Sequence, residues 1–156
     1  MNHWRDVAVP QMRHEALYGD RVVRCFAERP ASLLAMFERA RGERAQHDAV
    51  VCEGHRWSYA KTGEAADRLA GAFAARGIAA GERVLMLMGN RPEFLFVLLA
   101  LQRLGAIAVP VGVREQRPGL AYIAQQCGAK VIVFDDALAD RLPDDAEAPS
   151  LALRFA

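Results

Sequence analysis

Polar side chains follow two short apolar runs, and their types suit the binding of charged small molecules. Asn90, Arg91 and Glu93 come shortly after the run VLML, while Arg114 and Glu115 come after the run IAVPV. An arginine just past a buried strand suits an anion such as a phosphate. If both runs are parallel strands of one sheet, their carboxyl ends share one edge, where open α/β sheets bind ligands. These five residues are therefore the candidates for a binding site.

The first of these two loops also has a purely structural explanation. Asn90 can cap a helix whose first turn contains Pro92, and Glu93 would lie near the positive end of that helix. Helix capping is the more common use of such residues, so it is favoured over ligand binding for Asn90 and Glu93. For Arg114 the structural and the binding interpretations are evenly balanced.

Motifs that carry catalysis or phosphate binding are absent from the sequence. The chain has one threonine, Thr62, and three serines, which cannot supply a Ser/Thr/Gly-rich phosphate loop, and it has no GxGxxG fingerprint. Its three cysteines and four histidines show no metal-ligand spacing. We therefore predict no catalytic residue and no metal site, and we interpret five acidic residues as solvated surface: Asp135, Asp136, Asp140, Asp144 and Asp145.

Composition excludes several classes of protein. With 20 Lys and Arg against 19 Asp and Glu, the net charge of +1 provides no basic surface for nucleic acid. The longest apolar run, Phe94–Leu101, is interrupted by Gln102 and is too short to span a bilayer. No signal peptide is visible at the start of the chain. An odd number of scattered cysteines suits a reducing cytosol, so we expect a cytoplasmic protein.

The order of apolar and amphipathic segments predicts an α/β fold with three layers. Apolar runs separated by helical patterns indicate a parallel central sheet with crossover helices. The chain before Pro30 has no clear period, and we expect it to be irregular. The expected strands are 84–87, 107–111 and 131–134, with a small hairpin of 49–52 and 56–59 around Glu53–His55. The expected helices begin after Ser32, after Ser58 or Thr62, after Asn90 and at Pro118.

This order of segments resembles the N-terminal portion of AMP-forming acyl-CoA synthetases, particularly the fatty acid type. The resemblance covers most of the chain and is weaker before Ala49 and after Asp136. It implies three regions: an N-terminal extension (1–30), an α/β subdomain (31–136), and an acidic linker with the start of a continuation (137–156). The residues that carry it are Trp57, Tyr59, Leu69, Ala70, Gly77, Gly81, Val84–Met88 leading into Asn90–Phe94, Gly105–Ala106, Val109–Pro110 and Gly128–Val131.

The resemblance implies that a carboxylate is activated with ATP and magnesium and then transferred to coenzyme A. In this family the phosphate loop and the catalytic lysine come later in the chain, so the 156 residues are expected to be inactive alone and to bind none of these cofactors tightly. The segment Gly112–Val113–Arg114 corresponds to a region that borders the coenzyme A nucleotide in some relatives. Those relatives favour glycine where this chain has Val113 and Arg114.

Two functions of different classes remain open at this point. The chain is either part of a synthetase or a complete short binding or assembly module without enzymatic activity. In a synthetase its partner would be the rest of the same polypeptide. Alone, we expect it to form a homo-oligomer, because unfinished sheet edges and apolar helix faces such as Phe94–Leu104 recruit other chains.

Overall fold

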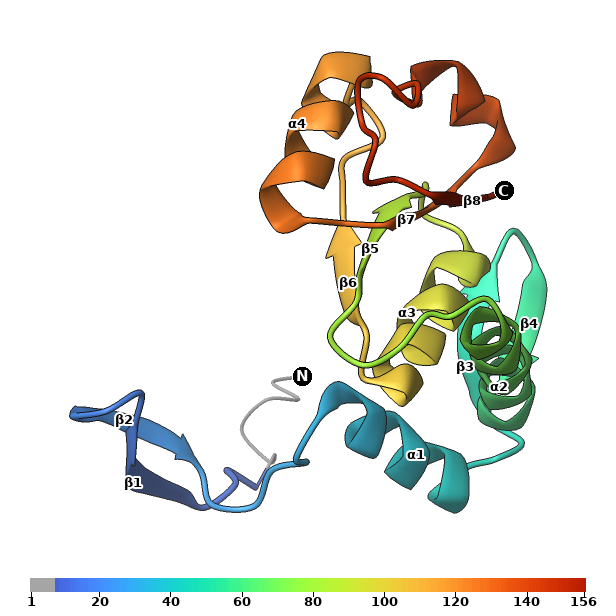
Figure 1. The fold of residues 1–156 in the computed structure, drawn as a ribbon. Coiled ribbons are helices and arrows are strands. Elements are labelled where there is room, and N and C mark those ends of the chain that lie inside the picture. Colours follow the sequence, from blue (N-terminus) through green and yellow to red (C-terminus); the bar gives the residue numbers. More distant parts are fainter. Residues whose placement is uncertain (1–7) are drawn as a thin grey trace.

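The computed structural model describes residues 8–156 and contains a four-stranded sheet with helices on both faces (Figure 1). In chain order the elements are β1 (Met12–Leu17), β2 (Arg21–Phe26), α1 (Leu33–Glu43), β3 (Asp48–Cys52), β4 (His55–Ser58), α2 (Tyr59–Ala75), β5 (Arg83–Leu87), α3 (Pro92–Leu104), β6 (Ile107–Pro110), α4 (Arg117–Cys127), β7 (Val131–Phe134), the 3₁₀ helix η1 (Asp136–Arg141) and β8 (Leu153–Phe155).

The central sheet is entirely parallel and has the strand order β6-β5-β7-β8. The three predicted central strands are therefore confirmed, and so is the prediction that they are parallel. In the middle strand, Leu85 lies opposite Val109 of β6 and Ile132 of β7. Its residues Val84–Leu87 are fully buried, because a parallel strand is covered by helices on both faces.

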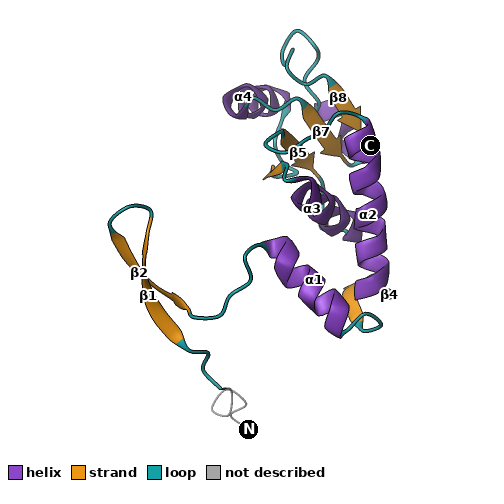
Figure 2. Cartoon of the chain, turned by 60° about the horizontal axis from the view of Figure 1, so that its bottom comes forward, coloured by secondary structure: helices purple, strands orange, loops and turns teal. Residues whose placement is uncertain are grey.

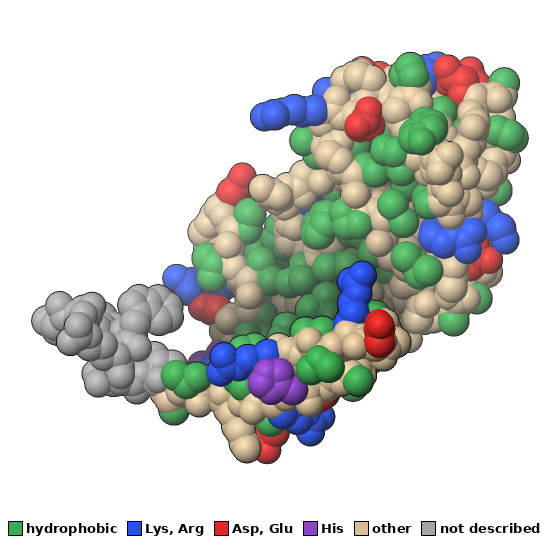
Figure 3. Space-filling model, turned by 90° about the vertical axis from the view of Figure 1, so that its left-hand side faces the viewer, with side chains coloured by type: hydrophobic (Ala, Val, Ile, Leu, Met, Phe, Trp, Pro, Cys, Tyr) green, Lys and Arg blue, Asp and Glu red, His purple; other side chains and the backbone are tan. Residues whose placement is uncertain are grey.

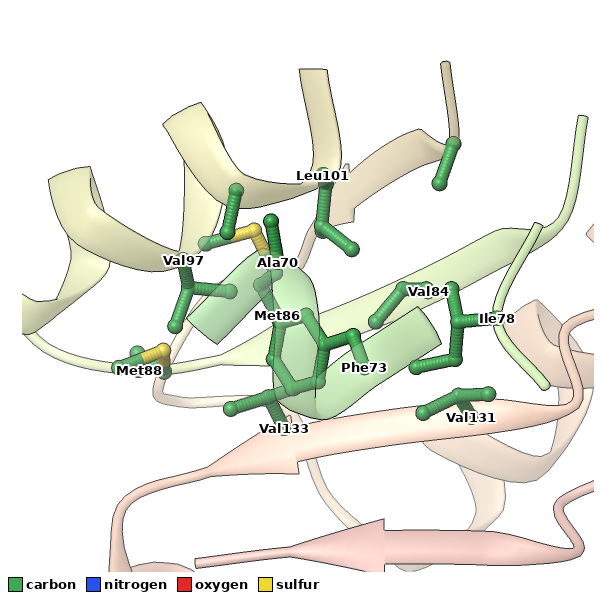
Figure 4. Packing of buried hydrophobic residues seen from close by; sticks show 12 residues of the cluster. Ala70, Phe73, Ile78, Val84, Met86, Met88, Val97, Leu101, Val131 and Val133 are labelled. Atoms are coloured by element: carbon green, nitrogen blue, oxygen red, sulfur yellow. The ribbon is translucent and has the colours of Figure 1, made fainter. Parts of the chain in front are cut away.

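Two apolar clusters fill the spaces above and below the sheet. On one face α2 and α3 pack against the strands, so that Phe73, Val97 and Leu101 lie against Val84 and Met86 (Figure 4). On the other face α4 and the segment before β8 cover the alternate side chains of the same strands. The fold is thus the predicted three-layer arrangement of helix, sheet and helix.

The last strand, β8, extends the sheet beyond β7. It pairs with β7 in parallel and anchors its aromatic residue on α2, where Phe155 packs against Phe73 with the ring centroids 5.6 Å apart. The guanidinium of Arg76 lies 5.4 Å from the centre of the Phe155 ring, at the distance of a cation–π contact.

Helix ends follow the predicted signals with one exception. The hydroxyl of Ser32 accepts a hydrogen bond from the Ala35 amide at 3.0 Å, and that of Ser58 accepts from the Lys61 amide at 3.2 Å. Thus Ser58, not Thr62, caps α2. The prediction that Asn90 caps α3 is wrong, since the cap position is Arg91 and no side chain caps that helix. Proline in the first turn has no amide hydrogen to satisfy, so this end needs one capping bond fewer.

Two β-hairpins flank α1, of which only the second was predicted. The expected turn around Glu53–His55 joins β3 to β4, with Glu53 and Gly54 both at positive φ. The expectation of irregular chain before Pro30 is wrong, because β1 and β2 form an antiparallel hairpin. Tyr18 and Gly19, at φ 56° and 88°, form its turn. This hairpin, called the arm below, projects away from the sheet and its helices (Figure 2).

Four charged side chains tie α1 to the helices that cover the sheet. Arg41 of α1 pairs with Asp67 of α2 at 3.1 Å, and Arg103 of α3 pairs with the same carboxylate at 2.7 Å and with Glu38 of α1. A Cβ at Gly63 would lie 2.4 Å from the guanidinium of Arg41, so a glycine here lets Arg41 cross the surface of α2. This network holds α1 beside α3.

Candidate functional site at the carboxyl edge of the sheet

The loops that follow β5, β6 and β7 leave the same edge of the sheet, because the three strands are parallel. The β5–α3 loop carries Asn90 and Arg91, and Glu93 follows in the first turn of α3. The β6–α4 loop carries Gly112, Val113, Arg114 and Glu115. The structure links the first loop to the end of β7 and the second loop to η1, so the candidates divide into two groups on one edge.

Asp135, the residue that follows β7, binds the first loop through both of its carboxylate oxygens. The amide of Gly89 donates to Asp135 Oδ2 at 2.7 Å, and Arg91 Nη1 donates to Asp135 Oδ1 at 3.0 Å. Arg91 Nε also donates to Glu93 Oε2 at 2.8 Å. We call these four residues the Asp135 latch. A Cβ on Gly89 would lie 3.3 Å from Asp135 Oδ2, so glycine allows this close approach.

The latch occupies Arg91 with two carboxylates. Glu93 and then Asp135 raise the pKa of Arg91, and Arg91 in turn lowers the pKa of Glu93. Two carboxylates offset the charge of this guanidinium, so it attracts an external anion less strongly than an unpaired arginine does. Arg91 therefore acts in positioning the β5–α3 loop, whereas Asn90 is exposed beside it.

Asp135 is far less exposed than the other acidic residues that follow β7 in the sequence led us to expect. We interpreted it as part of a solvated acidic surface, but its side chain is only 17% exposed and holds two donors. The sequence does contain a signal for this role, because Asp135 directly follows the third buried strand. The other candidates were chosen because they follow the first two buried strands.

The Arg91–Glu93 pair predicts a small dependence of stability on acid pH. Because the pKa of Glu93 is lowered in the folded state, the pair stabilises the fold above the ordinary glutamate pKa of about 4.3, and this stabilisation is lost as the pH falls through the folded-state pKa. The Glu93 side chain is 45% exposed, so solvent limits the effect to less than about 1 kcal/mol. Urea unfolding at about pH 6 and about pH 3 should show a larger loss of unfolding free energy for the natural chain than for Glu93→Gln. Equal losses would contradict this.

The second loop presents the free cation of this edge. Arg114 is exposed, and within residues 8–156 its guanidinium has no carboxylate partner. The neighbouring backbone is fixed, because Arg141 of η1 donates to the carbonyl of Val113 and the Glu115 amide donates to the carbonyl of Gly112 at 2.9 Å. Of the predicted candidates, Arg114 is thus the exposed cation that pairs with no carboxylate within residues 8–156.

An apolar cavity of about 370 Å³ lies beside the latch, between α2, α3 and the ends of β7 and β8. Phe73, Val97 and Phe155 contribute to its walls, while Arg76 and Asp136 lie at its charged rim. Its volume falls within the range of small-molecule sites. In the part of the chain that the structure describes, no group of three or more acidic, histidine or cysteine side chains could hold a metal ion.

The AMP-binding enzyme family matches residues 37–154, which is most of the chain, so the chain belongs to this family. Among curated relatives, the long-chain-fatty-acid–CoA ligase FadD13 of Mycobacterium tuberculosis is 38% identical over 79 residues, which cover 51% of this chain and 16% of that protein. Triostin synthetase I of Streptomyces triostinicus is 37% identical over 92 residues, covering 59% of this chain and 18% of that protein.

Solved structures agree with this assignment. The inhibitor-bound N-terminal domain of FACL13 from Mycobacterium tuberculosis is 28% identical, with a TM-score of 0.70 over 78% of this chain and 32% of that one. A fatty acyl CoA synthetase from the same organism is also 28% identical, with a TM-score of 0.71 over 78% of this chain and 26% of that one. This chain therefore has the fold of an N-terminal subdomain of adenylate-forming enzymes. It spans less than a fifth of the length of the curated relatives it matches.

No helix within residues 8–156 combines the length and the apolar character that crossing a membrane requires.

Proposed function

We propose that this chain is the N-terminal part of an ATP-dependent acyl-CoA ligase, which converts a carboxylate, ATP and coenzyme A to acyl-CoA, AMP and pyrophosphate. The observation that carries the proposal is the family match over residues 37–154 together with 38% identity to a long-chain-fatty-acid–CoA ligase. The two mycobacterial structures at 28% identity favour a fatty acid over other carboxylates. A crotonobetaine/carnitine–CoA ligase is 40% identical over 77 residues, so the ligase class is better supported than its substrate.

Within this proposal the carboxyl edge of the sheet borders coenzyme A. Arg114 is the exposed, unpaired cation of that edge among the described residues, and a guanidinium suits a phosphate group. Gly112 and Val113 hold the loop that presents it. Asn90, Arg91 and Glu93 shape the neighbouring loop, in which Arg91 is engaged by the latch.

The chemistry itself belongs to residues outside this chain. Binding the triphosphate and its magnesium needs a Ser/Thr/Gly-rich loop, which one threonine and three serines cannot form. We assign the region 31–136 to an α/β subdomain, the region 1–30 to an extension and the region 137–156 to a linker toward the rest of the polypeptide. The scattered cysteines favour a cytoplasmic location.

A chimera tests this function. Residues 37–154 would replace the matching segment of the Mycobacterium tuberculosis FadD13 ligase, and fatty-acid-dependent pyrophosphate release and acyl-CoA formation would be measured. We expect both activities, and we expect Arg114→Ala in the chimera to raise the KM for coenzyme A about tenfold while leaving the KM for ATP unchanged, because a charge-assisted bond to phosphate is worth about 1.4 kcal/mol or more. A folded chimera without fatty-acid-dependent pyrophosphate release would contradict the proposal.

A further inference from the structure

One face of the arm formed by β1 and β2 carries four apolar side chains on either side of His14 and Arg24, and no other element within residues 8–156 packs extensively on it. Side chains that lie opposite one another on this face include Met12 with Phe26 and Ala16 with Val22. Val22 is 68% exposed and Phe26 is 49% exposed. Both strands make extensive contacts only with each other. Because an isolated two-stranded hairpin is marginally stable in water, the arm requires a surface to pack on.

An apolar groove of about 340 Å³ lies between α1 and α3. Leu33 and Met36 of α1 form one wall and remain 42% and 48% exposed, while Leu95 and Leu99 of α3 form the other. No residue of the arm lines this groove. The space-filling view shows a hollow with a hydrophobic floor on the side of the molecule that bears the arm (Figure 3). Within residues 8–156, the apolar side chains of the arm and the apolar groove are thus both exposed and do not meet.

The arm and the groove also carry charged side chains of opposite sign. Arg24 lies between Val22 and Phe26 on the apolar face of the arm, and within residues 8–156 it pairs with no carboxylate. Glu43 follows Met36 and Ala40 at helical spacing, so it lies at the end of the groove wall. It too pairs with no basic side chain in the described part of the chain. The arm and the groove therefore each carry one free charge, of opposite sign, beside their apolar residues.

We propose that two copies of this chain exchange their arms, each arm lying in the α1–α3 groove of the other copy. A single two-fold axis lets both arms and both grooves be used at once, which closes the assembly as a dimer. Val22 and Phe26 pack against Leu33 and Met36 of the other copy, and Arg24 pairs with its Glu43. The inference concerns association alone and is independent of the proposed ligase function.

Pairing through a sheet edge is a poorer route to a dimer. At the outer strand β6, the amides of Ile107 and Val111 already donate to β5 and its flanking residues, so the outward positions are Ala108 and Pro110. Proline has no amide hydrogen, and Ala108 alone offers a donor within the strand. The opposite edge strand, β8, has only three residues. Neither edge therefore offers a long row of free donors and acceptors to a second copy.

Light scattering coupled to size-exclusion chromatography, over a tenfold range of concentration, tests the proposal. The natural chain should show a mass approaching twice 17.2 kDa. The pair of substitutions Val22→Asp and Phe26→Asp should raise the dimer dissociation constant at least about tenfold, because charges would enter an apolar contact. Tyr122→Asp, which alters a 63% exposed side chain on α4, is the matched control and should leave it unchanged.

A charge exchange identifies the partner surface even if an arm variant folds poorly. Arg24→Glu and Glu43→Arg should each raise the dissociation constant by up to about fivefold, the range of an exposed ion pair, and the two together should restore it. Circular dichroism would confirm that each variant keeps its helices. A monomer at every concentration would overturn the proposal, and so would a dimer indifferent to the arm and groove substitutions.

Discussion

The purified 156-residue chain is expected to release no pyrophosphate above background when it is supplied with ATP, magnesium and a fatty acid. The sheet edge presents Arg114 as an exposed cation, but the sequence lacks the hydroxyl-rich, glycine-rich loop that surrounds a triphosphate. A single cation without such a cradle does not align the α-phosphate with an attacking carboxylate, and alignment accounts for much of the rate of such reactions. A coupled assay for pyrophosphate measures the outcome.

The FadD13 chimera described above serves as the positive control under identical conditions, because it joins residues 37–154 to the rest of a ligase. Heat-denatured chain gives the background. Release of pyrophosphate that depends on both the fatty acid and the folded chain would contradict this prediction, and would mean that a phosphate site is assembled from residues far apart in the sequence.

The central sheet was predictable because burial leaves a plain signal in its strands. Val84–Leu87 and Val131–Phe134 are apolar at every position, as strands covered on both faces must be. The glycines that end α3 and α4, Gly105 and Gly128, have the left-handed conformation that a helix end favours. Local chemistry and the final fold agree in these elements, so the order of segments was sufficient to place them.

The arm was not predictable because its residues show no apolar pattern typical of a strand. Both of its faces mix arginines with apolar side chains, as in Arg21–Phe26, and no strict alternation appears. Its turn uses Tyr18 at positive φ, an unusual residue for such a position. A hairpin of this composition depends on what it packs against, and that information is not local.

The sequence predicted that the candidate site lies at the carboxyl edge of the sheet, but it did not predict which residues contact one another there. Parallel strands must end on a common side, so the loops after β5 and β6 could be placed from the order of segments. The contact between Arg91 and Asp135 could not be predicted in this way, because the two residues lie 44 positions apart in the chain. The choice between Arg91 and Arg114 as the free cation depends on that contact together with the local pair between Arg91 and Glu93.

Replacing Asp135 by alanine is expected to lower the free energy of unfolding by about 2 kcal/mol. The substitution leaves the Gly89 amide without its acceptor and removes one of the two carboxylates that hold Arg91. Loss of the acceptor of the partly buried Gly89 amide costs about 1.5 kcal/mol. Loss of the pair with Arg91, whose side chain is 48% exposed, costs less than about 1 kcal/mol because water replaces the carboxylate. Urea unfolding followed by circular dichroism measures the loss.

Two control variants test whether the loss of stability comes from the Asp135 latch itself. Asp136→Ala changes the adjacent, exposed residue, which makes no side-chain contact with a charged partner in the described structure, so it should cost less than about 0.5 kcal/mol. Asp135→Asn keeps an acceptor for the Gly89 amide but loses the charge that attracts Arg91, and should fall between the two alanine variants. In Asp135→Ala the Gly89 amide should also exchange its hydrogen faster than in the natural chain, because the bond that protects it is gone. If Asp135→Ala were no less stable than Asp136→Ala, the carboxylate would not be what joins the β5–α3 loop to β7.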